Sequence, residues 1–159
     1  MANYTATLAD SRKTILSAQA RAYSGFTHKW TIKYTDIDDD SATTTGDTIT
    51  VALGDTPTDF VIMRAMANVT TAFAGGGTLT MDVGTDGNED NFINLKSVTS
   101  VGPIIELSGA CPVTVAGTYA AASDALQAHF INSSSSNPAA LSAGEVDIYL
   151  SMISANDVG

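Results

Sequence analysis

The sequence predicts an all-β fold, built as a sandwich or a barrel. Between Trp30 and Met152, apolar and polar residues alternate in several short segments, and this period of two is typical of half-buried strands. Clusters of Gly, Pro, Asp and Ser separate the segments and indicate turns. Eight or so short strands divided by such turns are typical of sandwiches and barrels. At 159 residues the chain is long enough for one domain with its own core.

The first 25 residues predict a helix or an extended arm, distinct from the β domain that we expect over residues 26–159. In "DSRKTILSAQARAY", Asp10 or Ser11 is a candidate N-cap, because its side chain can accept a hydrogen bond from a free backbone N–H. The sequence "SGF" at 24–26 ends the helix. A helix this short is marginal in water, so we expect it to lie on a surface. Its thin apolar stripe comprises Ile15, Leu16, Gln19, Ala20 and Tyr23.

The period then changes to two. The stretch "HKWTIKYTDI" predicts a strand, and "TITVAL" predicts a second one after a polar loop, "DIDDDSATTTGD". The acidic run at 36–40 in this loop indicates an exposed turn, with weak cation binding as the alternative. The residues expected to face the core are Trp30, Ile32 and Tyr34 in the first strand and Ile49, Val51 and Leu53 in the second.

The stretch "FVIMRAMANVTTAF" at 60–73 is long enough to form a helix, but we interpret it as a long strand. Its second half is rich in β-branched residues, which favour strands. The turn "AGGG" follows, and "TLTMDVG" predicts a hairpin partner with Leu79, Met81 and Val83 inward. One face of the long strand would carry Val61, Met63, Ala65, Ala67, Val69 and Thr71.

The rest of the chain completes the β pattern. We expect "NEDNFINL" to form a short helical turn that docks Phe92, Ile93 and Leu95 on the core. The stretches "IIEL" and "PVTV" predict short strands, and "LQAHFIN" and "EVDIYLSMI" predict the two that close the fold. The inward residues of these last two strands are Leu126, Ala128 and Phe130, then Val146, Ile148, Leu150 and Met152.

The stretch "DVGTDGNEDNF" at 82–92 gathers acidic and amide side chains around two glycines. It does not fit an EF-hand, because a loop begun at Asp86 has Asn91 where glycine is required and Ser97 where the bidentate Glu is required. We interpret it as a turn in which Asp86 or Asn88 caps the helical turn that begins near Glu89. A looser calcium site is the alternative, and its ligands would be Asp82, Asp86, Asn88 and Asp90. We expect no cofactor.

Composition argues against several other functions. The net charge of −10 disfavours a nucleic-acid partner, since phosphate contacts need clustered Lys and Arg. No apolar run approaches the roughly 20 residues that cross a bilayer, and the N-terminus lacks the apolar core of a secretion signal. The single cysteine, Cys111, has no partner for a disulfide or a zinc site and is expected to be a small buried hydrophobe.

The sequence also offers no catalytic arrangement. His28 and His129 fall on different strands, His28 on the face of Trp30 and His129 on the polar face opposite Phe130. Neither has a Ser or Cys and a carboxylate nearby in a recognisable pattern. Paired carboxylates for glycoside hydrolysis leave no sequence signature, and nothing nominates a pair. We therefore expect that the protein is not an enzyme.

Charge is distributed unevenly. Five of the seven Lys and Arg residues lie in the first 33 positions, where Asp10 is the only acid, giving a net charge of +4. The remaining residues hold two bases and 16 acids, a net charge of −14. Such segregation predicts that the basic segment docks on something acidic, either the body itself, a neighbouring copy or an assembly partner; ordinary solubility charge is the alternative. The candidate interface residues are Arg12, Lys13, Ile15, Leu16, Arg21 and Tyr23.

Two stretches resemble a known family. "FVIMRAMANVTTAFAGGGTLTMDVGTDGNEDNFIN" is similar to a recurring pattern of small structural proteins of tailed bacteriophages: an extended strand, a short turn, and Gly-Thr followed by alternating acidic or amide residues and Phe. "LQAHFINSSSSNPAALSAGEVDIYLSMI" is similar to their C-terminal hairpin, whose polar loop ends in Leu-Ser-Ala-Gly-Glu-Val. The resemblance covers residues 46–153 and says nothing of the N-terminal segment.

The resemblance implies a jelly-roll-like antiparallel β-sandwich, here with an N-terminal helix or extended arm. It implies a capsid decoration (cement) protein that stabilises the head as a homotrimer bound to the major capsid protein or other virion proteins. Such a protein is made in the host cytoplasm and resides on the capsid surface. The alternatives are a tail, neck or fibre component and a carbohydrate-binding jelly-roll module. The aromatic residues not assigned to the core are Tyr4, Tyr23, Tyr119 and Tyr149.

Overall fold

The protein is a β-sandwich of two five-stranded sheets, which confirms the predicted all-β class. The computed structural model describes residues 3–7, 13–37, 47–55, 60–75, 77–105, 125–132 and 140–154, and the statements below concern these residues. The expected strand "PVTV", Cys111 and Tyr119 lie outside them. No helix in the described part of the chain is long and apolar enough to span a membrane.

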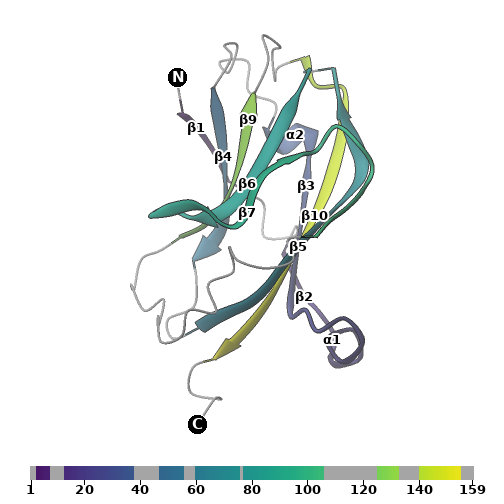
Figure 1. The fold of residues 1–159 in the computed structure, drawn as a ribbon, viewed down its shortest axis with the longest axis vertical. Coiled ribbons are helices and arrows are strands. Elements are labelled where there is room, and N and C mark those ends of the chain that lie inside the picture. The colour runs from purple at the N-terminus through teal and green to yellow at the C-terminus, as the bar shows by residue number, and fades with distance from the viewer. Residues whose placement is uncertain are drawn as a thin grey trace.

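One sheet, sheet A, has the order β1-β4-β9-β6-β7 (Figure 1). Its pairs are antiparallel except for the parallel pair of β1 with β4. The strands are β1 (Asn3–Thr7), β4 (Thr48–Asp55), β9 (Ala125–Asn132), β6 (Leu79–Thr85) and β7 (Asn88–Ser97).

The other sheet, sheet B, has the order β2-β3-β10-β5-β8, and its pairs are all antiparallel. The long strands β5 and β10 pair along most of their length at its centre. The strands are β2 (Lys13–Ile15), β3 (His28–Lys33), β10 (Ala143–Ser154), β5 (Phe60–Ala74) and β8 (Gly102–Ile105).

The core lies between the two sheets, where the predicted alternating residues meet. Trp30 is buried there and donates its indole N–H to the Leu53 carbonyl oxygen at 2.8 Å, which ties β3 to β4 across the sandwich. Phe73 and Phe130 pack with ring centroids 5.7 Å apart. Burial of each large side chain contributes about 1.5–3 kcal/mol, so this layer is the main source of stability.

The long strand expected at 60–73 is confirmed as β5, but its facing pattern changes near one end. Ser151 pairs with Arg64 and Met152 with Ile62, so the ladder skips Met63. A β-bulge of this kind moves the residues beyond it to the opposite face. Ile62 is therefore buried and Met63 is exposed, and the prediction that Met63 shares a face with Ala65 is wrong.

The N-terminal segment is only partly the helix we expected. Residues 13–15 form β2 rather than helix, and β1 adds to the edge of sheet A. The helix α1 (Ala18–Ser24) starts later than predicted, with Ser17 as its N-cap: the Ser17 hydroxyl accepts a hydrogen bond from the Ala20 N–H at 3.2 Å. The expected end at "SGF" is confirmed, since Gly25 adopts the left-handed conformation that closes helices (φ 71°).

Two further segments differ from prediction. Tyr34, expected in a strand, begins the four-residue helix α2 (Tyr34–Ile37), where the Asp36 carboxylate accepts a hydrogen bond from the Lys33 N–H at 2.7 Å. The stretch "NEDNFINL" forms β7 rather than a helical turn, because the edge of β6 supplies partners for its backbone. Asp86 and Asn88 therefore cap no helix.

Within β7, Phe92 and Ile93 are buried as predicted. Leu95, expected to dock on the core, is instead 59% exposed. The reason is a register shift in the ladder between Met81 and Val83, after which Leu95 no longer follows the alternation of the strand.

Candidate functional site

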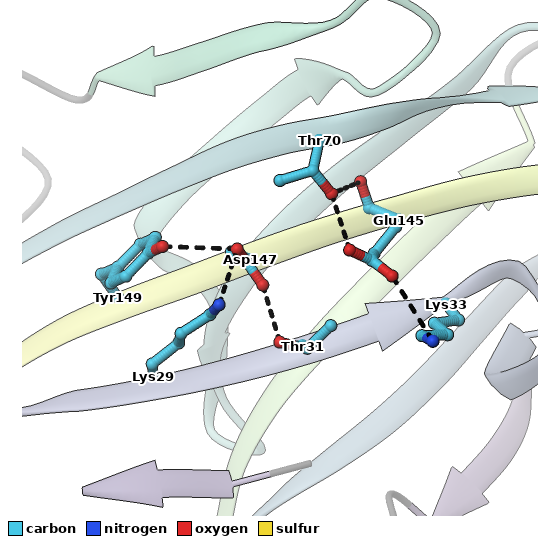
Figure 2. Close-up of polar contacts among 7 residues, drawn as sticks. All are labelled: Lys29, Thr31, Lys33, Thr70, Glu145, Asp147 and Tyr149. Carbon is cyan, nitrogen blue, oxygen red and sulfur yellow. Dashed lines mark hydrogen bonds and ion pairs between the residues drawn. The ribbon is translucent and has the colours of Figure 1, made fainter. Parts of the chain in front are cut away.

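A cluster of charged and hydroxyl side chains lies on the outer face of sheet B (Figure 2). It arises because alternate residues of β3 and β10 point away from the core, and the antiparallel register places opposite charges side by side. Lys33 pairs with Glu145, Thr31 with Asp147 and Lys29 with Tyr149.

Asp147 is the centre of this polar cluster and is only 5% exposed. Its carboxylate binds the Lys29 ammonium at 2.8 Å and accepts hydrogen bonds from the hydroxyls of Thr31 at 2.6 Å and Tyr149 at 3.3 Å (Figure 2). A buried carboxylate needs such partners. Because its partners lie on the same strand and on β3, Asp147 fastens β10 to β3.

Two pKa values reflect this environment. Burial alone would lower the pKa of Lys29, but the hydrogen bond and the charge of Asp147 outweigh burial and raise it. The pKa of Tyr149 is raised by burial and by the negative charge of Asp147. Both groups therefore stay protonated at neutral pH, as the ion pair and the hydrogen bond require.

A second part of the cluster lies two residues further along the same two strands. The Glu145 carboxylate is 3.6 Å from the Lys33 ammonium and accepts a hydrogen bond from the Thr70 hydroxyl at 2.9 Å. It links β3, β10 and β5 (Figure 2). These contacts are more exposed than those of Asp147, and exposed ion pairs contribute little. The sequence did not predict the cluster. Alternation puts Lys29 and Lys33 on one face of β3 and Glu145 and Asp147 on one face of β10, but it does not pair the two strands.

The acidic stretch 82–92, for which calcium binding was the alternative interpretation, surrounds a pocket of about 440 Å³ on the β6–β7 hairpin. Its lining residues are Asp82, Asp86, Gly87, Asn88, Glu89, Asp90, Asn94 and Leu95, so the four calcium candidates do lie together. Among the described residues, however, no three His, Cys, Asp or Glu side chains are placed to hold a metal ion. The geometry thus gives the calcium alternative no support.

Asp82 is the one buried carboxylate of this pocket. It accepts a hydrogen bond from the backbone N–H of Leu95, the residue displaced by the register shift in β7. Burial raises the pKa of Asp82, the Leu95 hydrogen bond opposes that rise, and the charge of Asp90 adds to it. Leu95 has a backbone φ of 43°, a left-handed value that residues other than glycine rarely adopt.

The two histidines have different surroundings. His28 shares the face of Trp30, as predicted, and the two rings stack with centroids 5.7 Å apart. His129 lies on the face of β9 opposite Phe130, also as predicted, but this face is covered, and His129 is only 1% exposed. The sequence shows no sign of this burial or of the approach of Glu89, from the distant β6–β7 hairpin, to His129.

His129 Nδ1 shares a hydrogen bond of 3.1 Å with the Thr50 hydroxyl and lies 4.0 Å from a Glu89 carboxylate oxygen. Its Nε2 has no hydrogen-bond partner within the described residues. Burial lowers the pKa of His129, and the charges of Glu89 and Asp82 only partly oppose this. The neutral imidazole is therefore the favoured form in the fold.

Of the predicted interface residues, Lys13 and Ile15 lie on β2, the edge strand of sheet B, and Arg21 and Tyr23 lie on α1, which follows β2 closely (Figure 1). Ile15 is 66% exposed on β2, Leu16 is half-buried, and Arg21 is exposed on α1. Lys13 and Tyr23 belong to β2 and α1, but their side chains lie outside the described set, as does all of Arg12.

The loop after α1 is packed on the outer face of sheet B. Phe26 is buried there, with its ring 5.8 Å from the Tyr149 ring and 5.3 Å from the Arg64 guanidinium. The Lys29 ammonium lies 5.7 Å from the centroid of the Tyr149 ring. Tyr149, one of the aromatic residues not assigned to the core, is thus engaged by its own chain.

Comparison with known proteins adds little. No protein-family model matches the chain, and no curated protein matches it. Among solved structures, the chain is similar to the crystal structure of PliG from Aeromonas hydrophila, a periplasmic lysozyme inhibitor of g-type lysozyme. The identity is 12%, the alignment covers 96% of this chain and 98% of that one, and the TM-score is 0.36. A likeness at this level carries no functional argument.

Proposed function

We propose that the protein is a bacteriophage virion structural protein, a capsid decoration protein that associates with copies of itself and with the capsid shell. The observation that carries the proposal is the placement of the N-terminal segment. Its two strands sit at the edges of the two sheets, and Ile15 is exposed on one of them. An edge strand offers unpaired backbone groups to a partner. The resemblance of residues 46–153 to phage structural proteins supports the same role.

The charge distribution suggests how this contact forms. Arg12, Lys13 and Arg21 precede β3 in a chain whose body is strongly acidic. Lys29 and Lys33, the other two bases of the first 33 residues, form ion pairs within the chain. Charge complementarity of this kind steers association and fixes the orientation of partners. A stable contact needs about 1,000 Å² of buried surface, which the edge of a small sandwich reaches most readily with an added segment. We propose a homotrimer on the capsid surface that acts without cofactor or catalysis.

The test compares two equally exposed apolar residues. Ile15→Asp places a charge on the proposed interface, and Val101→Asp places one beside β8, at the opposite edge of sheet B; the native residues are 66% and 68% exposed. We expect Ile15→Asp to remain folded but to weaken trimer formation in light scattering and binding to undecorated heads in cosedimentation. Val101→Asp should behave as the native protein. Full assembly by Ile15→Asp would refute this interface.

Deletion of residues 1–24 is the stronger perturbation. It removes β1, β2 and all of α1 while leaving the eight strands β3 to β10. We expect the remaining sandwich to fold and to lose trimerisation or virion attachment. A tail, neck or fibre component would use the same edge, and the position of the protein in a virion reconstruction separates that role from decoration.

A further inference from the structure

The β6–β7 hairpin is the least regular part of sheet A. Within the described residues, β7 pairs only with β6, and their ladder has register shifts between Met81 and Val83 and again between Val83 and Thr85. The buried anchors of β7 are Phe92 and Ile93, while its first three residues are exposed. An edge strand with an interrupted ladder opens locally at a lower free energy than the central strands.

Close backbone approach holds the tip of this hairpin against β6. A Cβ atom added at Gly84 would lie 2.2 Å from the Asn88 carbonyl oxygen and 2.5 Å from the Glu89 carbonyl carbon. Only glycine therefore lets residues 88 and 89 lie where they do. This approach brings the Glu89 carboxylate to 4.0 Å from His129 Nδ1.

The groups that face His129 come from three strands. From β4 comes the uncharged hydroxyl of Thr50, from β6 the carboxyl of Asp82, which is paired with His129 in register, and from β7 the carboxyl of Glu89. Asp90, on the same hairpin, acts on Asp82. The ring is buried, and its Nε2 has no hydrogen-bond partner in the described structure.

We propose that the β6–β7 hairpin is a proton-sensitive clasp, closed over neutral His129 and opened locally when His129 takes up a proton from solvent. In the Nδ1–H tautomer, the neutral ring donates towards Thr50 and Glu89 and Nε2 carries no hydrogen. Protonation adds an N–H at Nε2, a donor with no acceptor among the described residues. A buried charged donor without an acceptor is costly. Opening of the hairpin admits water to the imidazolium. The exposed residues 88–90 at the start of β7 can yield while Phe92 and Ile93 keep the rest of this edge strand in the core.

The sign of the effect follows from the two buried groups. Burial lowers the pKa of His129 below its ordinary 6.5, so the open form binds the proton more tightly. As pH falls from 6.5 to the lowered value, opening increases by at most about tenfold per pH unit. Burial raises the pKa of Asp82 above 3.8, so its protonation favours closure at lower pH. Opening should therefore be greatest at mildly acidic pH.

Amide hydrogen exchange measured by NMR tests this proposal. Protection of the β7 amides, corrected for intrinsic exchange, should fall up to about tenfold per unit as pH drops below 6.5, while that of the β10 amides stays unchanged. His129→Gln keeps polar atoms without the titration and should abolish the dependence. His28→Gln removes the other histidine and should retain it. Equal loss of protection in β10, or an unchanged dependence in His129→Gln, would overturn the proposal.

A second measurement needs no variant of the histidine. Ring resonances of the native protein should place the pKa of His129 below its ordinary 6.5, and Glu89→Gln should lower it further by removing an acidic neighbour. Titration of His129 at or above its ordinary value would refute the clasp even if His129→Gln does not fold. Neither measurement involves virus or oligomer, so the clasp and the proposed decoration role can fail separately.

Discussion

Replacement of Gly144 by alanine tests how tightly β10 packs on the core. Gly144 has a φ of 149°, and an added Cβ atom would lie 2.3 Å from Cδ1 and 2.5 Å from Cγ of Phe73. Phe73 cannot readily move aside, because it is buried and packs on Phe130. Gly144→Ala therefore combines backbone strain with a steric clash.

Gly54→Ala is the matched control. Gly54 also has a positive φ, 106°, but an added Cβ atom would meet nothing within 4 Å. Each substitution carries a backbone cost of about 1–3 kcal/mol for the unusual conformation. Gly144→Ala carries in addition the cost of overpacking the core, about 1–3 kcal/mol. We expect the free energies of unfolding of the two variants to differ by this second cost, about 1–3 kcal/mol.

Urea unfolding, monitored by the fluorescence of the core residue Trp30, measures the free energy of unfolding of each variant. Thermal unfolding should show the same order, with Gly144→Ala melting about 2–12 °C below Gly54→Ala, since 1 kcal/mol corresponds to about 2–4 °C in a protein of this size. If the two variants differ by less than about 0.5 kcal/mol, an effect typical of surface changes, the inferred clash with Phe73 is wrong.

Three other predictions concern the hairpin and the polar cluster. Gly84→Ala should lower the free energy of unfolding by about 1–3 kcal/mol through its clash with the hairpin backbone, whereas Gly87→Ala, which meets nothing within 4 Å, should change it by less than about 0.5 kcal/mol; equal urea midpoints would contradict this. Leu95→Asn should stabilise by about 0.5–1 kcal/mol in thermal unfolding, because asparagine tolerates the left-handed φ better, and a lower melting temperature would show that the Leu95 side chain contributes packing. Asp147→Asn should destabilise by about 1–2 kcal/mol in urea near neutral pH, a value reduced from that of a buried pair because Lys29 is partly exposed. The pKa of Lys29 is raised in the fold, so this difference should persist below pH 10.5 and shrink as pH rises through the raised value; a difference independent of pH would exclude the ion pair as its cause.

The all-β class and the inward faces of the regular strands were determined by the sequence alone. Trp30 and Ile32, or Ile148 and Leu150, could be assigned to the core because side chains of a strand alternate with a period of two. That period is local, and burial of one face follows wherever the strand remains regular. The end of α1 at Gly25 could also be predicted from the sequence, since a left-handed residue after a helix favours glycine.

Tertiary structure decided whatever depended on pairing between distant segments. Met63 and Leu95 left their predicted faces because register shifts in the ladders moved them, and "NEDNFINL" became a strand because β6 offered it an edge. The same pairing carried Glu89 to His129 and buried a histidine that its own strand had marked as outward. Alternation specifies which residues share a face, but only the neighbouring strands and their register determine what covers that face.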